Sequence, residues 1–335
     1  MTETIEKVAI LGDGAWGSAL AMVLVERGAS VIQWAHSETV ADEMMRHREN
    51  RKYLPGYPIP EGVTVSSDPG FFEHADLVVS AVPSRFLREV LTQLSDQLRK
   101  GRPFISATKG LEIPGRKRAS EIIRDVVGER PVAVLSGPSH AEEVAARMPT
   151  AVVAASDNPG FALRVQDLFT TERFRVYTSD DTVGVEYGGA LKNVLSIAGG
   201  LVDGLGFGDN TKAALLTRGQ TEMARLGMHL GGRIETFSGL SGIGDLVVSC
   251  VSPHGRNRQV GEQIGRGTKL SEVLPSIRGV PEGVTTVKAV VELADELGVD
   301  MPICREIHAV LFKDKDPLEA VRDLMTRQQK DEITA

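Results

Sequence analysis

The chain has 335 residues, of which 41% are hydrophobic and 25% are charged, which is typical of a soluble globular protein with room for about two domains. Its formal net charge of −7 argues against a surface that neutralises nucleic-acid phosphates, although a small anionic substrate needs only a local basic pocket. The two cysteines, Cys250 and Cys304, are too few and too isolated for a disulfide framework or a C-x-x-C metal site. We therefore expect neither a nucleic-acid partner nor a bound metal.

The start of the chain, residues 1–7, lacks the basic and then apolar profile of a secretory signal peptide. No apolar run approaches the roughly 20 residues that are needed to span a bilayer. Together with the scarcity of cysteines, these features predict a cytoplasmic protein without stable membrane insertion.

The first predicted strand ends in a glycine-rich turn. The apolar run Val8–Leu11 stops at Gly12, and a helix-forming run opens behind Ala15, with Gly12, Gly14 and Gly17 in the spacing G-x-G-x-x-G. In this motif the first glycine permits the tight turn, the second lets the backbone approach a pyrophosphate, and the third lets the helix pack closely on the strand. The phosphates would bind at the positive end of that helix. We therefore predict a dinucleotide-binding turn.

Short apolar runs and helical patterns alternate through the first half of the chain, as in a parallel sheet that is covered by helices on both faces. Arg85–Leu98 and Ala141–Arg147 are two of these helical patterns. The predicted strands are Lys7–Leu11, Ser30–Ala35, Val63–Ser66, Leu77–Ala81, Pro103–Ala107, Val132–Leu135, Ala151–Ala155 and Phe174–Thr178.

Strand-like runs disappear after Thr178, and long helical patterns replace them. The helices predicted there are Val185–Leu205, Lys212–Leu226, Leu270–Val273, Thr285–Leu297 and Met301–Phe312. We therefore predict an α/β Rossmann-type dinucleotide-binding domain over residues 1–180, followed by an all-α domain over residues 181–335 that binds the substrate.

The end of the second strand discriminates between the nicotinamide cofactors, because a carboxylate there binds ribose hydroxyls and a basic group accommodates a 2′-phosphate. The sequence Trp34-Ala35-His36-Ser37-Glu38 has no carboxylate at the expected place. His36 and Ser37 could contact a 2′-phosphate, with four basic residues near them in sequence, Arg46, Arg48, Arg51 and Lys52. Alternatively, these basic residues form a solvated helix face. The expected cofactor is NAD or NADP, with NADPH slightly favoured.

Lys192 lies on a predicted helix whose neighbouring positions are small. At three- and four-residue spacing its neighbours include Gly188, Gly189, Ser196 and Gly199. A ligand could approach such a face, and an ammonium there could polarise a ketone and give a proton to the developing alkoxide. The alternative is a helix-packing face of small residues that carries a surface lysine.

Two further segments carry candidate polar groups. Asp245 follows the glycine-rich loop Gly239–Gly244, where it either holds a lysine charged and oriented or caps the next helix. Further on, Gly255, Arg256 and Asn257 follow one another, and arginine and asparagine donors suit a phosphate. The alternative for this second segment is an exposed basic turn.

Together these segments resemble the bacterial-type NAD(P)-dependent glycerol-3-phosphate dehydrogenase family, and the resemblance covers nearly the whole chain. The matching blocks are Gly12–Gly17, Lys109–Glu112, Ser136–Glu143, Ala190–Asn193, Gly204–Leu215, Gly239–Leu246 and Arg256–Arg258. A glycine fingerprint alone is shared by many dehydrogenases, whereas this ordered set is specific.

The resemblance implies the reversible reduction of dihydroxyacetone phosphate to sn-glycerol 3-phosphate for glycerophospholipid synthesis, with Lys192 as the catalytic acid/base. The implied substrate-binding residues are Lys109, Gly137, Ser139, Lys192, Asp245, Gly255, Arg256 and Asn257. The cofactor-binding residues, together with the glycines of the turn, are Gly12, Gly14, Ala15, Trp16, Gly17, His36, Tyr53, Lys109, Ala141, Arg256, Val280 and Glu282. The implied partner is a small phosphorylated triose, and a homodimer is a further expectation.

Members of the family often have serine where this chain has Gly255, and arginine where it has His36. Two other interpretations stay open. A β-hydroxyacid dehydrogenase or ketopantoate-type reductase shares the two-domain plan, although Gly204–Leu215 and the Arg256-Asn257 pair favour a phosphorylated substrate. A non-catalytic nicotinamide sensor is the third interpretation, and the presence of both Lys192 and Asp245 argues against it.

Overall fold

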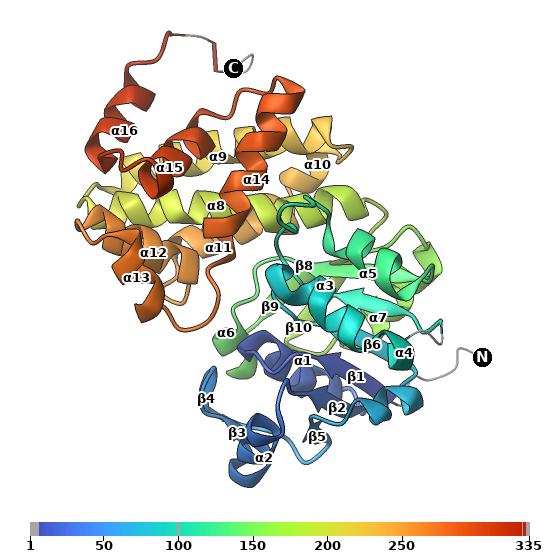
Figure 1. Cartoon of the computed structure of the whole chain (residues 1–335). Helices are drawn as coiled ribbons and strands as arrows, with labels where there is room; N and C mark the ends of the chain where they lie inside the picture. The colour runs from blue at the N-terminus through green and yellow to red at the C-terminus, as the bar shows by residue number, and fades with distance from the viewer. Residues whose placement is uncertain (1–6, 99–100, 330, 333–335) are drawn as a thin grey trace.

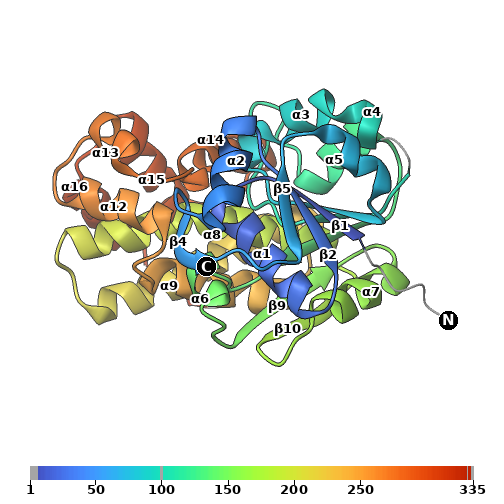
Figure 2. The same ribbon diagram turned by 90° about the horizontal axis from the view of Figure 1, so that it is seen from below.

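The computed structural model of the chain describes residues 7–98, 101–329 and 331–332. The N-terminal half forms a sheet lobe and the C-terminal half a helical lobe (Figure 1). Seen from below, the helical lobe stands to one side of the sheet (Figure 2). Residues 1–6, on which most of the argument against a signal peptide depends, lie outside the described residues.

An eight-stranded sheet in the order β10-β9-β8-β7-β6-β1-β2-β5 forms the centre of the sheet lobe. From β1 the chain builds outward to β2 and β5 on one side, and then to β6, β7 and β8 on the other, which creates a switch point where such sheets bind ligands. Each predicted strand is present, with nearly the predicted bounds. The strands are β1 (Lys7–Leu11), β2 (Ser30–Trp34), β5 (Val63–Ser66), β6 (Leu77–Ser80), β7 (Phe104–Ser106), β8 (Val132–Ser136), β9 (Thr150–Ala155) and β10 (Phe174–Ser179).

The sheet is parallel, as predicted, except at one pair of strands. β9 pairs antiparallel with β8, whereas the other pairs of this sheet are parallel. A parallel return needs a crossover that carries the chain back along the sheet, and the connection after β8 holds only the short helix α6 (Ala141–Ala145). The next connection contains the longer α7 (Pro159–Phe169), and β10 is accordingly parallel to β9.

Helices cover both faces of the sheet, and β1 contributes to both cores. Val8 and Ile10 pack with α1 (Ala15–Glu26) and α7, whereas Ala9 and Leu11 pack with the helices of the opposite face. Burial on both faces explains why these strands are continuous apolar runs. The helices of the opposite face are η1 (Pro69–His74), α3 (Ser84–Gln93), α4 (Ser95–Leu98) and α5 (Ala119–Val127), so that the predicted helix Arg85–Leu98 is divided at Leu94.

Three elements between β2 and β5 were not among the predicted helices and strands. They are α2 (Glu38–His47), β3 (Glu49–Asn50) and β4 (Leu54–Pro58), and the two strands form a separate antiparallel pair. They lie at the end of the sheet that carries the glycine turn, because the Asn50 side chain donates to the backbone oxygen of Asp13 at 2.8 Å.

The helical lobe is built around α8 (Thr182–Gly204), which is buried along nearly its whole length. Its core is separate from the two cores of the sheet lobe. The elements around α8 are α9 (Asp209–His229), α10 (Ile234–Phe237), η2 (Leu240–Gly244), α11 (Asp245–Val251), α12 (Arg256–Gly265), α13 (Leu270–Ser276), α14 (Glu282–Leu297), α15 (Pro302–Phe312) and α16 (Pro317–Met325).

Four glycines, Gly200 and Gly204 on α8 and Gly261 and Gly265 on α12, bring these two helices into backbone contact. A Cβ atom on Gly200 would meet the carbonyl oxygen of Arg258, and one on Gly261 would meet the carbonyl oxygen of Ile197. Gly204 faces α12 in the same way. This close crossing places Asn257, in the first turn of α12, against Asn193 in the middle of α8.

One segment within the described ranges, Ile234–Val251, is long and apolar enough to cross a membrane by composition alone. In the structure the backbone is extended at Gly239 and leaves helical angles again at Gly242, so that α10, η2 and α11 are three short elements. Asp245 within this segment is paired with two lysines, which is the arrangement of a buried polar site.

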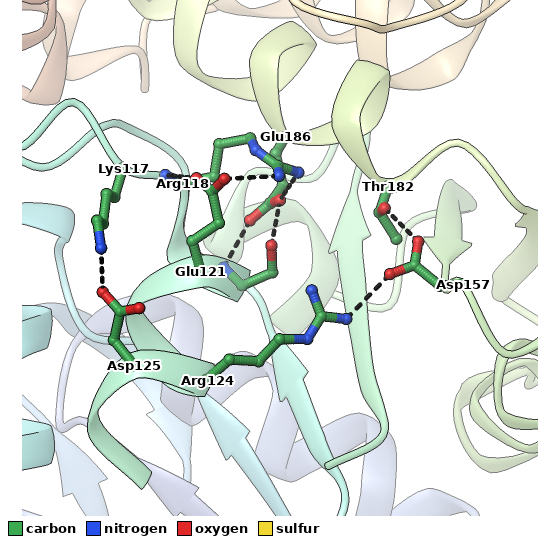
Figure 3. A network of polar contacts seen from close by, with 9 residues as sticks. Lys117, Arg118, Glu121, Arg124, Asp125, Asp157, Thr182 and Glu186 are labelled. Carbon is green, nitrogen blue, oxygen red and sulfur yellow. Dashed lines mark hydrogen bonds and ion pairs between the residues drawn. The ribbon is translucent and has the colours of Figure 1, made fainter. Parts of the chain in front are cut away.

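The two lobes are joined where α5 meets α8, as Figure 3 shows. The Glu186 carboxylate on α8 accepts hydrogen bonds from the Ser120 backbone N–H at 2.8 Å, the Ser120 hydroxyl at 2.6 Å and the Arg118 guanidinium at 2.9 Å. Beside it, Asp157 accepts from the Thr182 hydroxyl at 2.7 Å and from Arg124 at 3.0 Å. These contacts fix the start of α8 against the sheet lobe.

Candidate active site

The candidate site lies where the carboxyl ends of β7 and β8 meet α8 and α11. Lys109 follows β7, and Gly137 and Ser139 follow β8. The Lys109 ammonium donates to the Gly137 carbonyl at 2.9 Å and lies 3.5 Å from the Ser139 hydroxyl. Ser139 also donates to the Gly137 carbonyl at 2.8 Å. The structure thus brings together three of the predicted substrate-binding residues.

Asp245 joins this strand edge to the helical lobe. Its Oδ2 accepts from Lys109 Nζ at 2.7 Å, and its Oδ1 lies 3.1 Å from Lys192 Nζ. The N-cap position of α11 is Gly244, so that the alternative in which Asp245 caps this helix is wrong. The carboxylate holds two ammonium groups from different lobes.

Lys192 is buried, in contrast to the alternative in which it is a surface lysine. Its Nζ donates to the Ser249 hydroxyl at 2.7 Å. The small residues near it in sequence have different uses. Gly188 packs against the backbone of Ser241, Gly199 packs against Cys250, and Gly189 lies beside Lys109. Most of this face of the helix therefore packs against protein.

Burial and neighbouring charges tune the ionisable groups of this cluster. Burial lowers the pKa of Lys192 to about 8, Asp245 opposes this change, and the charge of Lys109 adds to it. For Asp245, burial favours the protonated acid, but the two lysines outweigh it and lower its pKa. The pKa of His140, which begins the turn into α6, is lowered to about 4, chiefly by burial and then by Lys192. Near pH 7 the cluster therefore contains a neutral imidazole, a carboxylate and an amine that can exchange its proton.

A chain of amides leads from Lys109 to α12. Asn193 Nδ2 donates to the Lys109 backbone oxygen at 3.3 Å, and Asn257 Nδ2 donates to Asn193 Oδ1 at 3.0 Å. Asn257 in turn accepts from the Gly283 N–H at 2.9 Å. These bonds connect both lobes to the start of α12.

Arg256 is the first residue of α12 and is exposed, and a Cβ atom on Gly279 would lie 3.0 Å from its guanidinium. Gly255 precedes it as the N-cap residue, where a Cβ atom would lie 2.8 Å from the Ser249 carbonyl. The segment is therefore a helix N-terminus rather than the exposed basic turn that was the alternative. An exposed guanidinium beside free helix N–H groups suits an anion.

The glycine turn has the form that the sequence predicts. Gly12 has a φ of +121°, and a Cβ atom on Gly17 would lie 2.6 Å from the Gly12 carbonyl, so that both positions require glycine. Gly14 is the N-cap residue of α1. A Cβ atom on Gly14 would meet nothing within 4 Å, and no side chain caps that helix. This open helix N-terminus fits the pyrophosphate of a dinucleotide.

Among the residues beyond β2 that the sequence analysis named for a 2′-phosphate, Arg46, Arg51 and Lys52 are exposed, whereas Ser37 and Arg48 are bonded within the protein. Ser37 caps α2 by accepting from the Val40 N–H at 3.4 Å. Arg48 donates to the carbonyls of Val63 and Ile59, and Arg51 lies 3.4 Å from Glu49. Ser37 and Arg48 are thus used by the protein itself, whereas the Arg51 side chain stays 53% exposed. His36 is exposed, and its Nδ1 lies 2.5 Å from Asp13 Oδ2.

The other predicted cofactor residues lie on elements of both lobes. Ala15 and Trp16 begin α1, Ala141 begins α6, and Tyr53 lies under Lys52 in the loop between β3 and β4. Val280 precedes Glu282, whose carboxylate accepts from the Ser84 N–H at 2.9 Å and from the Ser84 hydroxyl. Glu282 therefore links the helical lobe to the carboxyl end of β6.

Four supporting residues were missed by the sequence analysis. Ser249 bonds Lys192, and Asn193 bonds Lys109 and Asn257. Gln33 donates to the Gly12 carbonyl at 2.9 Å, and Asn50 fixes the Asp13 backbone. Asn193 adjoins Lys192 in the sequence, which was a usable signal, whereas the other three contacts depend on residues that are distant in the chain.

Comparisons with known proteins agree with this geometry. Residues 7–162 match the family model of the NAD-dependent glycerol-3-phosphate dehydrogenase N-terminus, and residues 181–322 match that of its C-terminus. The chain belongs to this family. The glycerol-3-phosphate dehydrogenase [NAD(P)+] of Prosthecochloris aestuarii is 50% identical over 330 residues, which cover 97% of this chain and 99% of the relative. That of Lysinibacillus sphaericus is 49% identical over 333 residues, covering 98% of each chain.

Solved structures support the same assignment to the glycerol-3-phosphate dehydrogenase family. The crystal structure of the glycerol-3-phosphate dehydrogenase of Coxiella burnetii has a TM-score of 0.93 at 40% identity, and covers 96% of this chain and 99% of that one. A ketopantoate reductase of Ralstonia eutropha has a TM-score of 0.61 at 18% identity, over 94% of this chain and 99% of that one, and this likeness is one of fold alone.

Proposed function

We propose that this family member catalyses the NAD(P)H-dependent reduction of dihydroxyacetone phosphate to sn-glycerol 3-phosphate, and the reverse reaction, for glycerophospholipid synthesis. The observation that carries the proposal is the buried Lys192 ammonium, which Asp245 holds beside Lys109 at the carboxyl edge of the sheet. We further propose a cytoplasmic location, a homodimer and a division of labour at residues 180/181. In this division the sheet lobe binds the dinucleotide and the helical lobe binds the phosphorylated triose.

Residues of both lobes would hold the cofactor. The turn of Gly12, Gly14 and Gly17 would hold the pyrophosphate at the N-terminus of α1, and Lys109 and Glu282 would provide further contacts to the dinucleotide. When bound, NAD(P)H supplies the hydride that reduces the ketone. The matching positions Ala15, Trp16, His36, Tyr53, Ala141, Arg256 and Val280 complete the cofactor site.

Lys192 is the acid in the direction of reduction. Negative charge develops on the carbonyl oxygen of the triose, and the Lys192 ammonium stabilises this charge and donates a proton to it. In the reverse direction the neutral amine accepts the hydroxyl proton. The pKa of about 8 suits both roles, because the amine changes its charge close to physiological pH.

Substrate binding is assigned to groups on either side of Lys192. Lys109, Gly137, Ser139 and Asp245 line the triose, and Gly255, Arg256 and Asn257 hold its phosphate. Binding energy from the remote phosphate can then orient the reacting carbonyl. Unphosphorylated dihydroxyacetone is accordingly expected to be a poor substrate.

The test compares purified wild-type protein with Lys192→Ala. In an assay with dihydroxyacetone phosphate, run with NADH and NADPH in parallel, the variant is expected to lose roughly 10²- to 10⁴-fold in kcat, which is the usual contribution of a general acid. Binding of NADH, measured by fluorescence, should change by less than about twofold, since an alanine leaves the glycine turn intact.

Lys269→Ala is the matched control, because Lys269 is exposed on the helical lobe. Near-normal turnover of Lys192→Ala would remove this lysine from the chemical step. Turnover of keto acids in preference to dihydroxyacetone phosphate would favour the ketopantoate-type interpretation. Cofactor binding without turnover of any ketone would favour the sensor.

A further inference from the structure

A carboxylate from the glycine turn reaches the end of β2. Asp13 lies between Gly12 and Gly14, and its Oδ2 is 2.5 Å from Nδ1 of His36, which lies just beyond β2. The backbone of Asp13 is fixed because Asn50 donates to its carbonyl oxygen at 2.8 Å. The chain therefore has a carboxylate at the point where the sequence of β2 itself provides none.

The hydrogen bond between Asp13 and His36 leaves one polar atom of each side chain available to a ligand. A carboxylate only accepts, so His36 Nδ1 carries the proton of this hydrogen bond. Among the residues that the structure describes, neither Asp13 Oδ1 nor His36 Nε2 has a hydrogen-bond partner. The side chains are 16% and 58% exposed, which leaves both atoms accessible from solvent.

These two atoms match the two forms of the adenosine ribose. A ribose diol donates hydrogen bonds, which a carboxylate oxygen accepts, whereas a 2′-phosphate is repelled by a carboxylate and attracted by an imidazolium. Of the other cations near the pair, Arg48 donates to backbone carbonyls and Arg51 lies 3.4 Å from Glu49, whereas Arg46 and Lys52 are exposed, with Lys52 close enough to Asp13 for their charges to interact.

We propose that Asp13 and His36 together set the relative affinity of the chain for NAD(H) and NADP(H). Asp13 accepts from the ribose hydroxyls of NAD(H), and His36, held in place by Asp13, binds the 2′-phosphate of NADP(H). One pair thus serves both cofactors, and its two members have opposite effects on selectivity. This inference rests on the dinucleotide that the proposed function uses.

The test measures Kd for NADH and NADPH by fluorescence titration without any triose, so that its outcome does not depend on Lys192 or on turnover. Asp13→Asn keeps an acceptor for His36 but removes the charge, and should raise Kd for NADH about tenfold while leaving that for NADPH unchanged or lower. His36→Gln should raise Kd for NADPH about tenfold and change that for NADH by less than about threefold.

Asp42→Asn is the matched control, because it removes an exposed carboxylate of the same lobe and should leave both Kd values unchanged. Competition with 5′-AMP and with adenosine 2′,5′-bisphosphate places any effect at the adenosine ribose. Thermal unfolding of each variant identifies loss of folding. Equal factors for NADH and NADPH in Asp13→Asn, or no change in either, would overturn the proposal, because Asp13 would then only shape the turn.

Discussion

Asp245 is buried between two lysines. When both lysines are protonated, the three side chains together have a net charge of +1. Burial favours the neutral forms of Lys192 and Asp245, and the charge of each opposes this effect on the other. The net positive charge lies where the proposed reaction develops an oxyanion. Lys192 can release its proton because Asp245 shares its carboxylate with Lys109.

This arrangement predicts the pH dependence of the reduction. Burial and Lys109 lower the pKa of Lys192 to about 8, and the protonated amine is the active form. The kcat for reduction should therefore be constant below about pH 8, and fall about tenfold per pH unit above it. A rate profile from about pH 6 to pH 10 at saturating substrate checks this.

A substitution of Asp245 tests whether the fall in kcat above about pH 8 comes from Lys192. Asp245 raises the pKa of Lys192 against burial, so that Asp245→Asn should move the fall in kcat to lower pH as well as reduce its maximum. If the fall in kcat keeps its position in the variant, then another group donates the proton.

At the scale of single residues, the sequence could predict the identities better than the contacts. The neighbours of Lys192 suggested a face open to ligand, yet Gly188 and Gly199 are filled by Ser241 and Cys250. Spacing along a helix shows which positions are small, but the segments that fill them come from later in the chain. The partnership of Lys192 with Ser249 was missed for the same reason.

At the scale of elements, the crossing of α8 and α12 depends on the absence of side chains. A methyl group on Gly200 would meet the backbone of Arg258 and lie 2.7 Å from the Glu262 nitrogen, and neither atom can move independently of α12. The same crossing places Asn257 against Asn193. The packing of these helices therefore determines the position of the proposed phosphate site.

Gly200→Ala is expected to lower the free energy of unfolding by about 1–3 kcal/mol, which is the usual cost of overpacking a core. Urea denaturation measures this change. Gly208→Ala is the control, because a Cβ atom there would meet nothing within 4 Å. If both variants unfold at the same urea concentration, the helices have more room than the structure gives them.

The strands were predictable because burial on both faces makes each a short apolar run, as in β1 and β6. The direction of β9 was not predictable in this way, since an apolar run has the same composition whichever way it pairs. The first turn of α12 was equally hidden. Its polar sequence Arg256–Gln259 resembles a loop, and it is helical because glycines further along the helix pack on α8.

At the scale of the whole molecule, the proposed chemistry needs the two lobes to hold one geometry. The cofactor turn belongs to the sheet lobe, whereas Lys192 belongs to α8. The Glu186 carboxylate is 4% exposed and accepts three hydrogen bonds from α5 and the residue before it, so that the start of α8 is fixed to the sheet lobe (Figure 3). Burial raises the pKa of Glu186, so the cost of replacing this carboxylate lies in its hydrogen bonds: an amide would turn an NH2 group toward one of the three donors and leave that donor without an acceptor.

Glu186→Gln should therefore lower the free energy of unfolding by about 2 kcal/mol or more, and reduce kcat by a larger factor than it raises Kd for NADH, because the glycine turn lies in the sheet lobe whereas Lys192 lies on α8. Asp125→Asn is the control, since Asp125 is paired with Lys117 at the surface of α5 and within one lobe, where an exposed pair contributes at most about 1 kcal/mol. Denaturation and steady-state kinetics separate the two effects. If Glu186→Gln behaves like Asp125→Asn in both measurements, other contacts between the lobes hold Lys192 in place, and the position of the proposed acid does not depend on this carboxylate.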